Sequence, residues 1–95
     1  MKIEVTPEAA AVLRRSKELM GGRGIRLRLS RGLGGGESVQ VEVAAGPAPG
    51  DLTEEISDDL VLYVEPAVLD VVPEPLVALE PDHEKVVVRP RPTSG

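Results

Sequence analysis

The chain has 95 residues, a formal net charge of −5 at pH 7 and no cysteine. This length allows one compact domain with a single core, and the lack of cysteine excludes disulfides, thiolate metal sites and cysteine nucleophiles. No apolar run approaches the roughly 18 residues of a membrane span. The charged N-terminus, with Lys2 and Glu4, has no apolar signal-peptide core. We therefore expect a cytoplasmic protein that does not interact with membranes.

Charge is distributed unevenly along the chain. Residues 1–31 include eight basic and three acidic residues, whereas residues 32–84 include thirteen acidic residues and no lysine or arginine. The acidic stretch disfavours nucleic acid as a partner, and Tyr63 is the single aromatic residue available for base stacking. Two interpretations remain open: the two blocks neutralise each other within the fold, or the acidic block forms a patch for a dedicated partner. We favour the first.

The first strongly predicted element is a helix from about Pro7 to Met20. Thr6 is a suitable N-cap, Pro7 suits the first helical position, and Gly21 and Gly22 supply the left-handed exit. Apolar residues spaced three and four apart predict the face that packs on the core. That face comprises Ala9, Val12, Leu13, Ser16, Leu19 and Met20.

Two alternating segments, 24–31 and 38–43, flank a glycine-rich loop. Apolar residues recur at every second position, which predicts two strands that each bury one face. These residues are Ile25, Leu27, Leu29, Val39, Val41 and Val43. The loop from Gly32 to Gly36 leads into a strand and not into a helix, so we favour a hairpin loop over a phosphate-binding loop. Glu37 is the only reactive side chain beside it.

The second half of the chain predicts short strands and one short helix. The connector from Gly46 to Asp51 is rich in turn residues. The segment 60–64 is apolar on both faces, which indicates a covered, central strand. A proline opens a helix within residues 66–72. The other strands are predicted at residues 52–56, 76–79 and 86–88, with a turn at 57–59.

We expect residues 89–95 not to pair regularly with a sheet, because prolines interrupt the segment. The predicted organisation is a single domain over residues 1–89 followed by a disordered, proline-rich tail over residues 90–95.

The charged residues raise the question of a cation site, an anion site or a catalytic group. Glu54, Glu55, Asp58 and Asp59 collect carboxylates that suit a hard cation, but their spacing is not that of a calcium loop, and we favour a solvated acidic turn. The helix carries basic residues that suit an anion site, although a solvated helix face is the better interpretation. They are Arg14, Arg15 and Lys17. His83 is expected to be exposed, and no nucleophile, base and orienting group can be assembled.

Four segments carry a family resemblance through their order and spacing: residues 3–10, 24–27, 47–51 and 62–65. The first is similar to a strand followed by a threonine-capped, alanine-rich helix. The second is similar to a glycine, apolar, arginine, leucine strand start, and the third to a proline-to-aspartate turn. The fourth, with Leu69 and Val72, is similar to a strand, an acidic residue and a short helix. Together they resemble the HesB-like family of A-type iron-sulfur carriers.

The resemblance implies a compact, sheet-rich α+β fold with mixed β-sheets, one long N-terminal helix and one short helix. It also implies self-association and, in typical members, transfer of iron-sulfur clusters to apoproteins. Those members hold the metal with one cysteine in the glycine-rich loop and two in a Cys-Gly-Cys run near the C-terminus. The loop position falls on Gly34 here, and the run is missing.

Because clusters are held mainly by thiolates, one histidine cannot replace three cysteines. We therefore assign no catalytic, cofactor-binding or metal-binding residue and expect no cofactor. The predicted function is that of a non-enzymatic interaction or structural protein, with a protein partner or a second copy as its partner. The alternative is an accessory factor in iron-sulfur cluster assembly or iron handling that acts through a partner protein.

Overall fold

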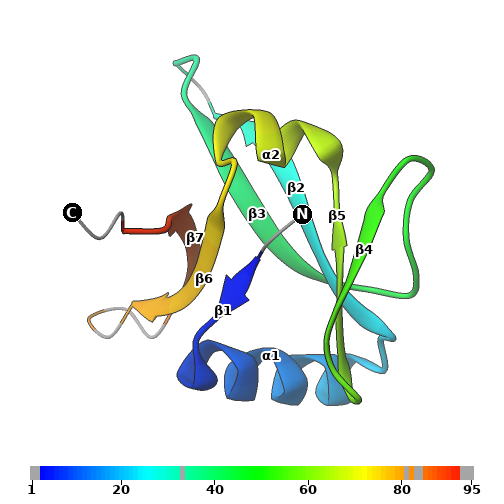
Figure 1. Cartoon of the computed structure of the whole chain (residues 1–95). Coiled ribbons are helices and arrows are strands. Elements are labelled where there is room, and N and C mark those ends of the chain that lie inside the picture. Colours follow the sequence, from blue (N-terminus) through cyan, green and yellow to red (C-terminus); the bar gives the residue numbers. More distant parts are fainter. Residues whose placement is uncertain (1–2, 33, 81, 83–84, 93–95) are drawn as a thin grey trace.

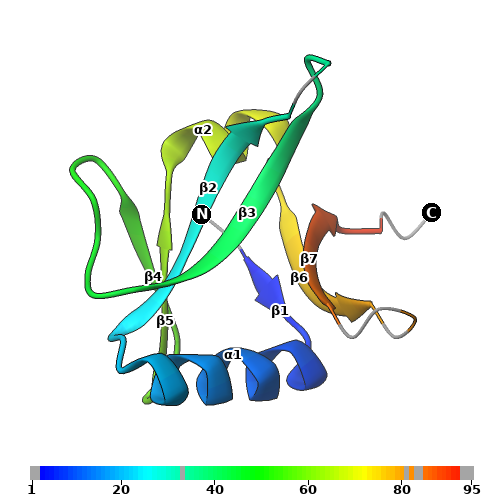
Figure 2. The same cartoon turned by 180° about the vertical axis from the view of Figure 1, so that it is seen from behind.

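Two β-sheets and two helices enclose the apolar core (Figures 1 and 2). The computed structural model describes residues 3–32, 34–80, 82 and 85–92. Within these residues the elements are β1 (Glu4–Val5), α1 (Pro7–Met20), β2 (Gly24–Arg31), β3 (Glu37–Ala44), β4 (Leu52–Ser57), β5 (Leu60–Val64), α2 (Pro66–Val71), β6 (Pro75–Glu80) and β7 (Lys85–Pro90). The expected α+β class, with mixed sheets, a long first helix and a short second one, is confirmed.

The larger sheet, in the order β3-β2-β5-β4, is built on the predicted hairpin. β2 and β3 pair antiparallel, with Ile25 opposite Val43 and Leu27 opposite Val41. Ile25 and Leu27 are buried, and the valines of β3 pack against the edge of the core. The predicted alternation is therefore confirmed.

β5 lies between β2 and β4, parallel to the first and antiparallel to the second. Leu60, Leu62 and Val64 have no exposed surface. The prediction of a covered, central strand is confirmed. Its parallel pairing with β2 could not be predicted from the sequence. Period-two alternation shows which face of a strand is buried but does not show which strand lies alongside.

The smaller sheet, in the order β1-β6-β7, corrects the expectation for the C-terminus. Arg89 lies opposite Leu76 and Pro90 lies opposite Pro75, so β7 extends to Pro90. β7 is an edge strand with one neighbour in the sheet, and such a strand accepts a proline. The backbone N–H of Arg91 then donates to the carbonyl oxygen of Glu74 at 3.0 Å. Residues 93–95 of the predicted tail lie outside the described residues.

Helix α1 crosses one end of the strands and α2 lies at the other end (Figure 2). The predicted cap is confirmed, because Thr6 Oγ1 accepts from the backbone N–H of Ala9 at 3.2 Å and Gly21 ends the helix with φ 67°. The predicted burial of the last turn is wrong: Leu19 is 77% exposed and Met20 is 72% exposed. The strands do not close over this end of the helix, and Met20 borders an open groove.

The Thr6 cap supplies a first prediction. Thr6→Ala is expected to lower the free energy of unfolding by about 1 kcal/mol, because an N-terminal N–H of α1 loses its acceptor. Thr6→Ser keeps the hydroxyl and should retain most of the stability. Urea denaturation followed by circular dichroism measures both, and equal stability of the alanine variant and the wild type would contradict the cap.

The two faces of β2 supply a second prediction. Leu27 has no exposed surface, and Leu27→Ala is expected to cost about 2 to 5 kcal/mol of stability through lost burial and a cavity. Arg28, the next residue, is exposed, and Arg28→Ala is expected to change stability by less than about 1 kcal/mol. The reverse ranking in denaturant melts would show that the faces of β2 are assigned wrongly.

Candidate functional site

The glycine-rich loop joins β2 and β3 and projects from the sheet (Figure 1). The Gly32 N–H donates to the carbonyl oxygen of Gly36 at 2.8 Å, as expected of a hairpin loop. Gly34 adopts φ 102° and Gly35 adopts φ 86°, a backbone region that residues with a Cβ rarely take. Glu37 opens β3, with its carboxylate 3.7 Å from Arg31. The loop therefore holds its shape through glycine and presents no side chain at Gly34.

The acidic turn and the basic helix meet each other. The Arg14 guanidinium donates to the Asp59 carboxylate at 2.9 Å and to the Ser57 hydroxyl at 3.1 Å, while Lys17 contacts the backbone carbonyl of Asp59. The Ser57 hydroxyl and Arg14 lower the pKa of Asp59. These contacts oppose both a free anion site on α1 and a cation site at Asp59.

Within the part of the chain that is described, no group of three or more histidine, aspartate or glutamate side chains is placed to hold a metal ion. His83 lies outside that part. No helix in the same residues is long and apolar enough to cross a bilayer.

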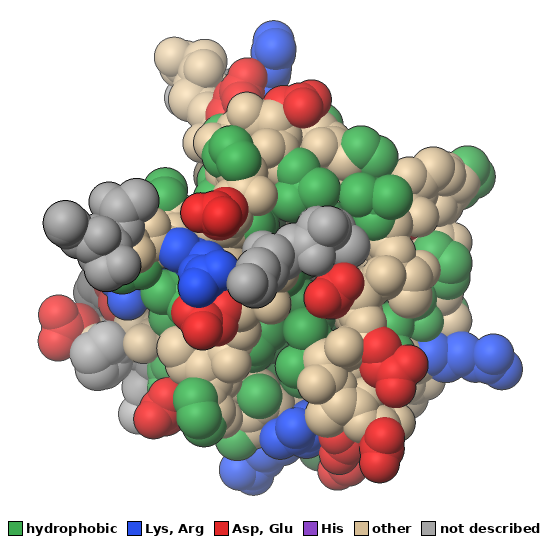
Figure 3. Space-filling view, in the orientation of Figure 1, with side chains coloured by type: hydrophobic (Ala, Val, Ile, Leu, Met, Phe, Trp, Pro, Cys, Tyr) green, Lys and Arg blue, Asp and Glu red, His purple; other side chains and the backbone are tan. Residues whose placement is uncertain are grey.

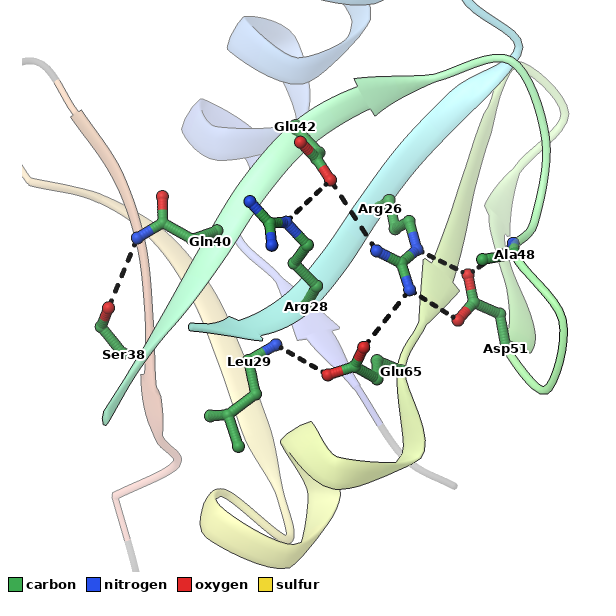
Figure 4. Close-up of polar contacts among 9 residues, drawn as sticks. All are labelled: Arg26, Arg28, Leu29, Ser38, Gln40, Glu42, Ala48, Asp51 and Glu65. Atoms are coloured by element: carbon green, nitrogen blue, oxygen red, sulfur yellow. Dashed lines mark hydrogen bonds and ion pairs between the residues drawn. The ribbon is translucent and has the colours of Figure 1, made fainter. Parts of the chain in front are cut away.

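Among the described residues, the most extensive polar cluster is centred on Arg26 of β2 (Figure 4). Its guanidinium donates twice to Asp51, at 2.8 and 3.1 Å, and lies 3.4 Å from Glu65 and 3.8 Å from Glu42. Glu65 also accepts from the backbone N–H of Leu29 at 3.1 Å. We call Arg26, Asp51, Glu65, Glu42 and Arg28 the Arg26 cluster; Arg28 lies 3.1 Å from Glu42.

Asp51 is the most enclosed member, with 1% of its side chain exposed. The hydrogen bonds from Arg26 lower the pKa of Asp51 against the opposing effect of burial, and the Ala48 N–H, 2.9 Å away, lowers it further. The same contact raises the pKa of Arg26. Both groups therefore stay charged, and the pair fixes the connector between β3 and β4 against the sheet.

The Arg26 cluster was not predicted from the sequence, although a signal was present. Arg26, Asp51 and Glu65 lie in three of the four segments that carry the family resemblance. Their charges are complementary, but they are separated by 25 and 39 residues from Arg26. Sequence spacing alone does not show that such distant residues meet.

The expected neutralisation of the basic and acidic blocks is confirmed. The arginines at positions 14, 26, 28 and 31 each pair with a carboxylate from residues 37–65. Figure 3 shows basic and acidic side chains interspersed over one face of the molecule. This arrangement favours a structural use of these four arginines and their carboxylate partners.

An apolar groove of about 870 Å³ opens between the edge strands β3 and β7, with α1 and α2 at its ends. It is lined mainly by valines, and Glu37, Glu42 and Lys85 are its charged members. The valines are Val12, Val39, Val41, Val43, Val71, Val72, Val86, Val87 and Val88. The apolar part of this lining suits contact with another apolar surface.

Solved structures with the same architecture are found among iron-sulfur proteins. The crystal structure of IscA with the [2Fe-2S] cluster superposes with a TM-score of 0.70 at 20% sequence identity, covering 92% of this chain and 81% of that one. The chain has the fold of the iron-sulfur cluster carriers. The resemblance drawn from the sequence, to a HesB-like fold without cysteine, is thereby confirmed at the level of the fold.

Two further structures agree. The crystal structure of Escherichia coli SufA, involved in biosynthesis of iron-sulfur clusters, gives a TM-score of 0.69 at 22% identity, covering 93% of this chain and 77% of that one. A solution NMR structure of a protein from Aquifex aeolicus gives 0.66 at 16% identity, covering 94% and 91%. No protein-family model matches the sequence, and neither does any curated protein.

The depressed pKa of Asp51 predicts a pH dependence of stability. Its folded-state pKa lies below its unfolded value of about 4, so the unfolded chain takes up the proton first as the pH falls. The stability that Asp51 contributes is therefore complete above about pH 4 and is lost as the pH falls through the folded-state value. Asp51→Asn should lower stability by about 2 kcal/mol at neutral pH and flatten the acid limb.

Urea denaturation at a series of pH values measures this effect. Asp58→Asn, at an exposed position, is the matched control and should leave the acid limb unchanged. An acid limb as steep in Asp51→Asn as in the wild type would show that Asp51 is not the group responsible.

Proposed function

We propose that this chain is a non-enzymatic protein of the carrier fold that acts by contact with other proteins and does not itself bind an iron-sulfur cluster. The observation that carries the proposal is the absence of cysteine from a fold whose solved example, IscA, contains a [2Fe-2S] cluster. Clusters are held by cysteine thiolates, with histidine as an occasional substitute. This chain has no thiol and a single histidine.

The conformation of the glycine-rich loop supports the proposal. The position that corresponds to the family's loop cysteine is Gly34, with φ 102°. A Cβ at this position meets no atom within 4 Å, so space is available, but the backbone conformation disfavours any residue other than glycine. The loop is built to turn the chain between β2 and β3, and presenting a ligand there requires a different backbone.

A second candidate is an accessory factor in cluster assembly or iron handling that docks on a cluster-bearing partner. The similarity to SufA, whose structure is described as that of a protein involved in iron-sulfur cluster biosynthesis, favours this candidate. It differs from the first in one measurable respect, because a cluster signal would then depend on a partner protein.

Anaerobic incubation with iron and sulfide, followed by gel filtration and elemental analysis, tests the proposal. The wild-type chain is expected to remain colourless and to carry no stoichiometric iron or sulfide, whereas IscA, treated in parallel, supplies the positive control. Stoichiometric uptake by the wild-type chain would contradict the proposal. Iron that appears on the chain only when cluster-loaded IscA is present would favour the accessory role.

Gly34→Cys extends the test to the loop. One thiolate per subunit leaves a four-cysteine cluster short of ligands even in a dimer, so at most weak uptake is expected. Because the cysteine also adopts an unfavourable backbone conformation, we expect a stability loss of about 1 to 3 kcal/mol. Gly36→Cys, in the same loop but without a positive φ, controls for thiol exposure.

A further inference from the structure

We infer that the free edge of β3 binds an extended peptide segment of another protein, which lies along the groove and adds to the larger sheet as a further strand. This inference rests on the proposed function, action through protein contact, and names the surface and the chemistry of the partner. It starts from the strands that have a single neighbour within the described residues, which are β1, β3, β4 and β7. Such a strand leaves a row of backbone N–H and C=O groups unpaired.

Three of these edge strands carry features that hinder the addition of another strand. β1 is two residues long. β4 has an irregularity in its register between Glu55 and Ser57, and β7 begins with Lys85 and ends with Pro90. Short length, bulges, lysine and proline are the means by which proteins protect the edges of their sheets.

β3 has none of these features. It is eight residues long, pairs with β2 in unbroken register from Glu37 to Ala44, and contains no lysine or proline. Its two charged side chains, Glu37 and Glu42, form ion pairs with arginines of β2 on the paired side of the strand. The free edge is therefore open to backbone hydrogen bonds with an extended peptide.

The side chains beside this edge indicate which peptide fits. Val39, Val41 and Val43 line the groove at alternate positions of β3, and Val86 and Val88 line it from β7. The side chains of an added strand also alternate, so every second one points into the groove and buries apolar surface against these valines. A lipid chain would fill the same space but would leave the N–H and C=O groups of β3 without partners. We therefore expect a peptide with apolar residues at alternate positions.

The groove admits a single extended segment and disfavours the edge of a folded sheet. β3 borders it on one side and β7 on the other. A strand that belongs to a sheet brings its neighbour about 4.8 Å away, and that neighbour would meet β7. The β3 strand of a second copy is already paired with its own β2, so it does not fit here. A single segment has both of its edges free.

Charge complementarity indicates an acidic residue in the peptide. Glu37 and Glu42 line the groove, but each already has an arginine partner in β2. Lys85, the third charged residue of the lining, forms no ion pair within the part of the chain that is described. A carboxylate on the bound segment therefore compensates the charge that remains.

A titration followed by two-dimensional NMR tests strand addition. The probe is a capped peptide as long as β3, with alternating valine and threonine and a glutamate at each end. Saturable shifts are expected at β3 and β7, and amide hydrogen exchange is expected to slow at alternate residues of β3, because every second N–H faces the added strand. Two further probes are N-methylated, one at the valines and one at the threonines. One of these two, and not both, is expected to lose binding, since alternate N–H groups point to opposite edges.

Val41→Thr tests the groove wall. Threonine keeps the branched shape and the strand propensity but places a hydroxyl against the apolar face of the peptide. The dissociation constant of the peptide is expected to rise about threefold to tenfold. Val61→Thr is the matched control, because Val61 of β5 is also half-buried but does not line the groove. It should leave the constant unchanged.

Lys85→Glu tests the charge assignment. It is expected to weaken binding of the glutamate-ended peptide by about threefold or more, and to strengthen binding of a peptide that has lysine at both ends. Arg89→Glu changes the net charge by the same amount in the same strand, at an exposed residue that does not line the groove. This control should leave the preference between the two peptides unchanged.

Absence of saturable binding, or shifts that lie away from β3, would overturn the inference. Equal binding of both N-methylated peptides would show apolar contact without an added strand. If the chain dimerises and the peptide dissociates the dimer, the occupant is a second copy and the assignment to another protein is wrong. All of these measurements use protein without iron or sulfide, so cluster uptake by the wild type would overturn the proposed function separately from peptide binding.

Discussion

The ion pair between Arg26 and Asp51 is the interaction on which the arrangement of the larger sheet and its connections depends. Arg26 lies within β2, Asp51 ends the connector that leads to β4, and Glu65, the third member, precedes α2. One guanidinium thus holds a strand, a crossing loop and the entry to a helix in fixed relation. Because Asp51 is almost fully enclosed, water competes little with the pair, and removal of Arg26 leaves the buried Asp51 carboxylate without a compensating charge.

Other charged side chains also form ion pairs within the molecule. The basic N-terminal third of the chain and the acidic middle face each other across strand pairs and across the contact between α1 and the β4–β5 turn. Most arginines are therefore occupied within the molecule. The acidic net charge of −5 describes the whole surface and does not mark a binding patch.

The glycine-rich loop and the groove bear on two possible functions of this fold, which are ligand binding at the loop and protein contact at the groove. The loop, where the family resemblance would place a cysteine, is closed by the hydrogen bond from the Gly32 N–H to the Gly36 carbonyl oxygen and has no thiol. The groove between β3 and β7 and the neighbouring end of α1 leave apolar surface open. Exposed apolar surface is suited to contact with other proteins, which is the function that we propose.

The sequence by itself determined the local structure. Thr6, Pro7 and Gly21 set the two ends of α1, and alternation marks Ile25, Leu27, Val41 and Val43 as the core-facing side of the hairpin. Both signals could be read from the sequence because caps and periodicity are properties of near neighbours. Only the tertiary structure decided the rest. It placed β5 parallel to β2, brought Asp51 and Glu65 to Arg26, drew Arg89 and Pro90 into β7 and left Leu19 and Met20 uncovered. Each of these depends on residues far apart in the chain, and the pattern within one segment carries no information about which distant segment will lie against it.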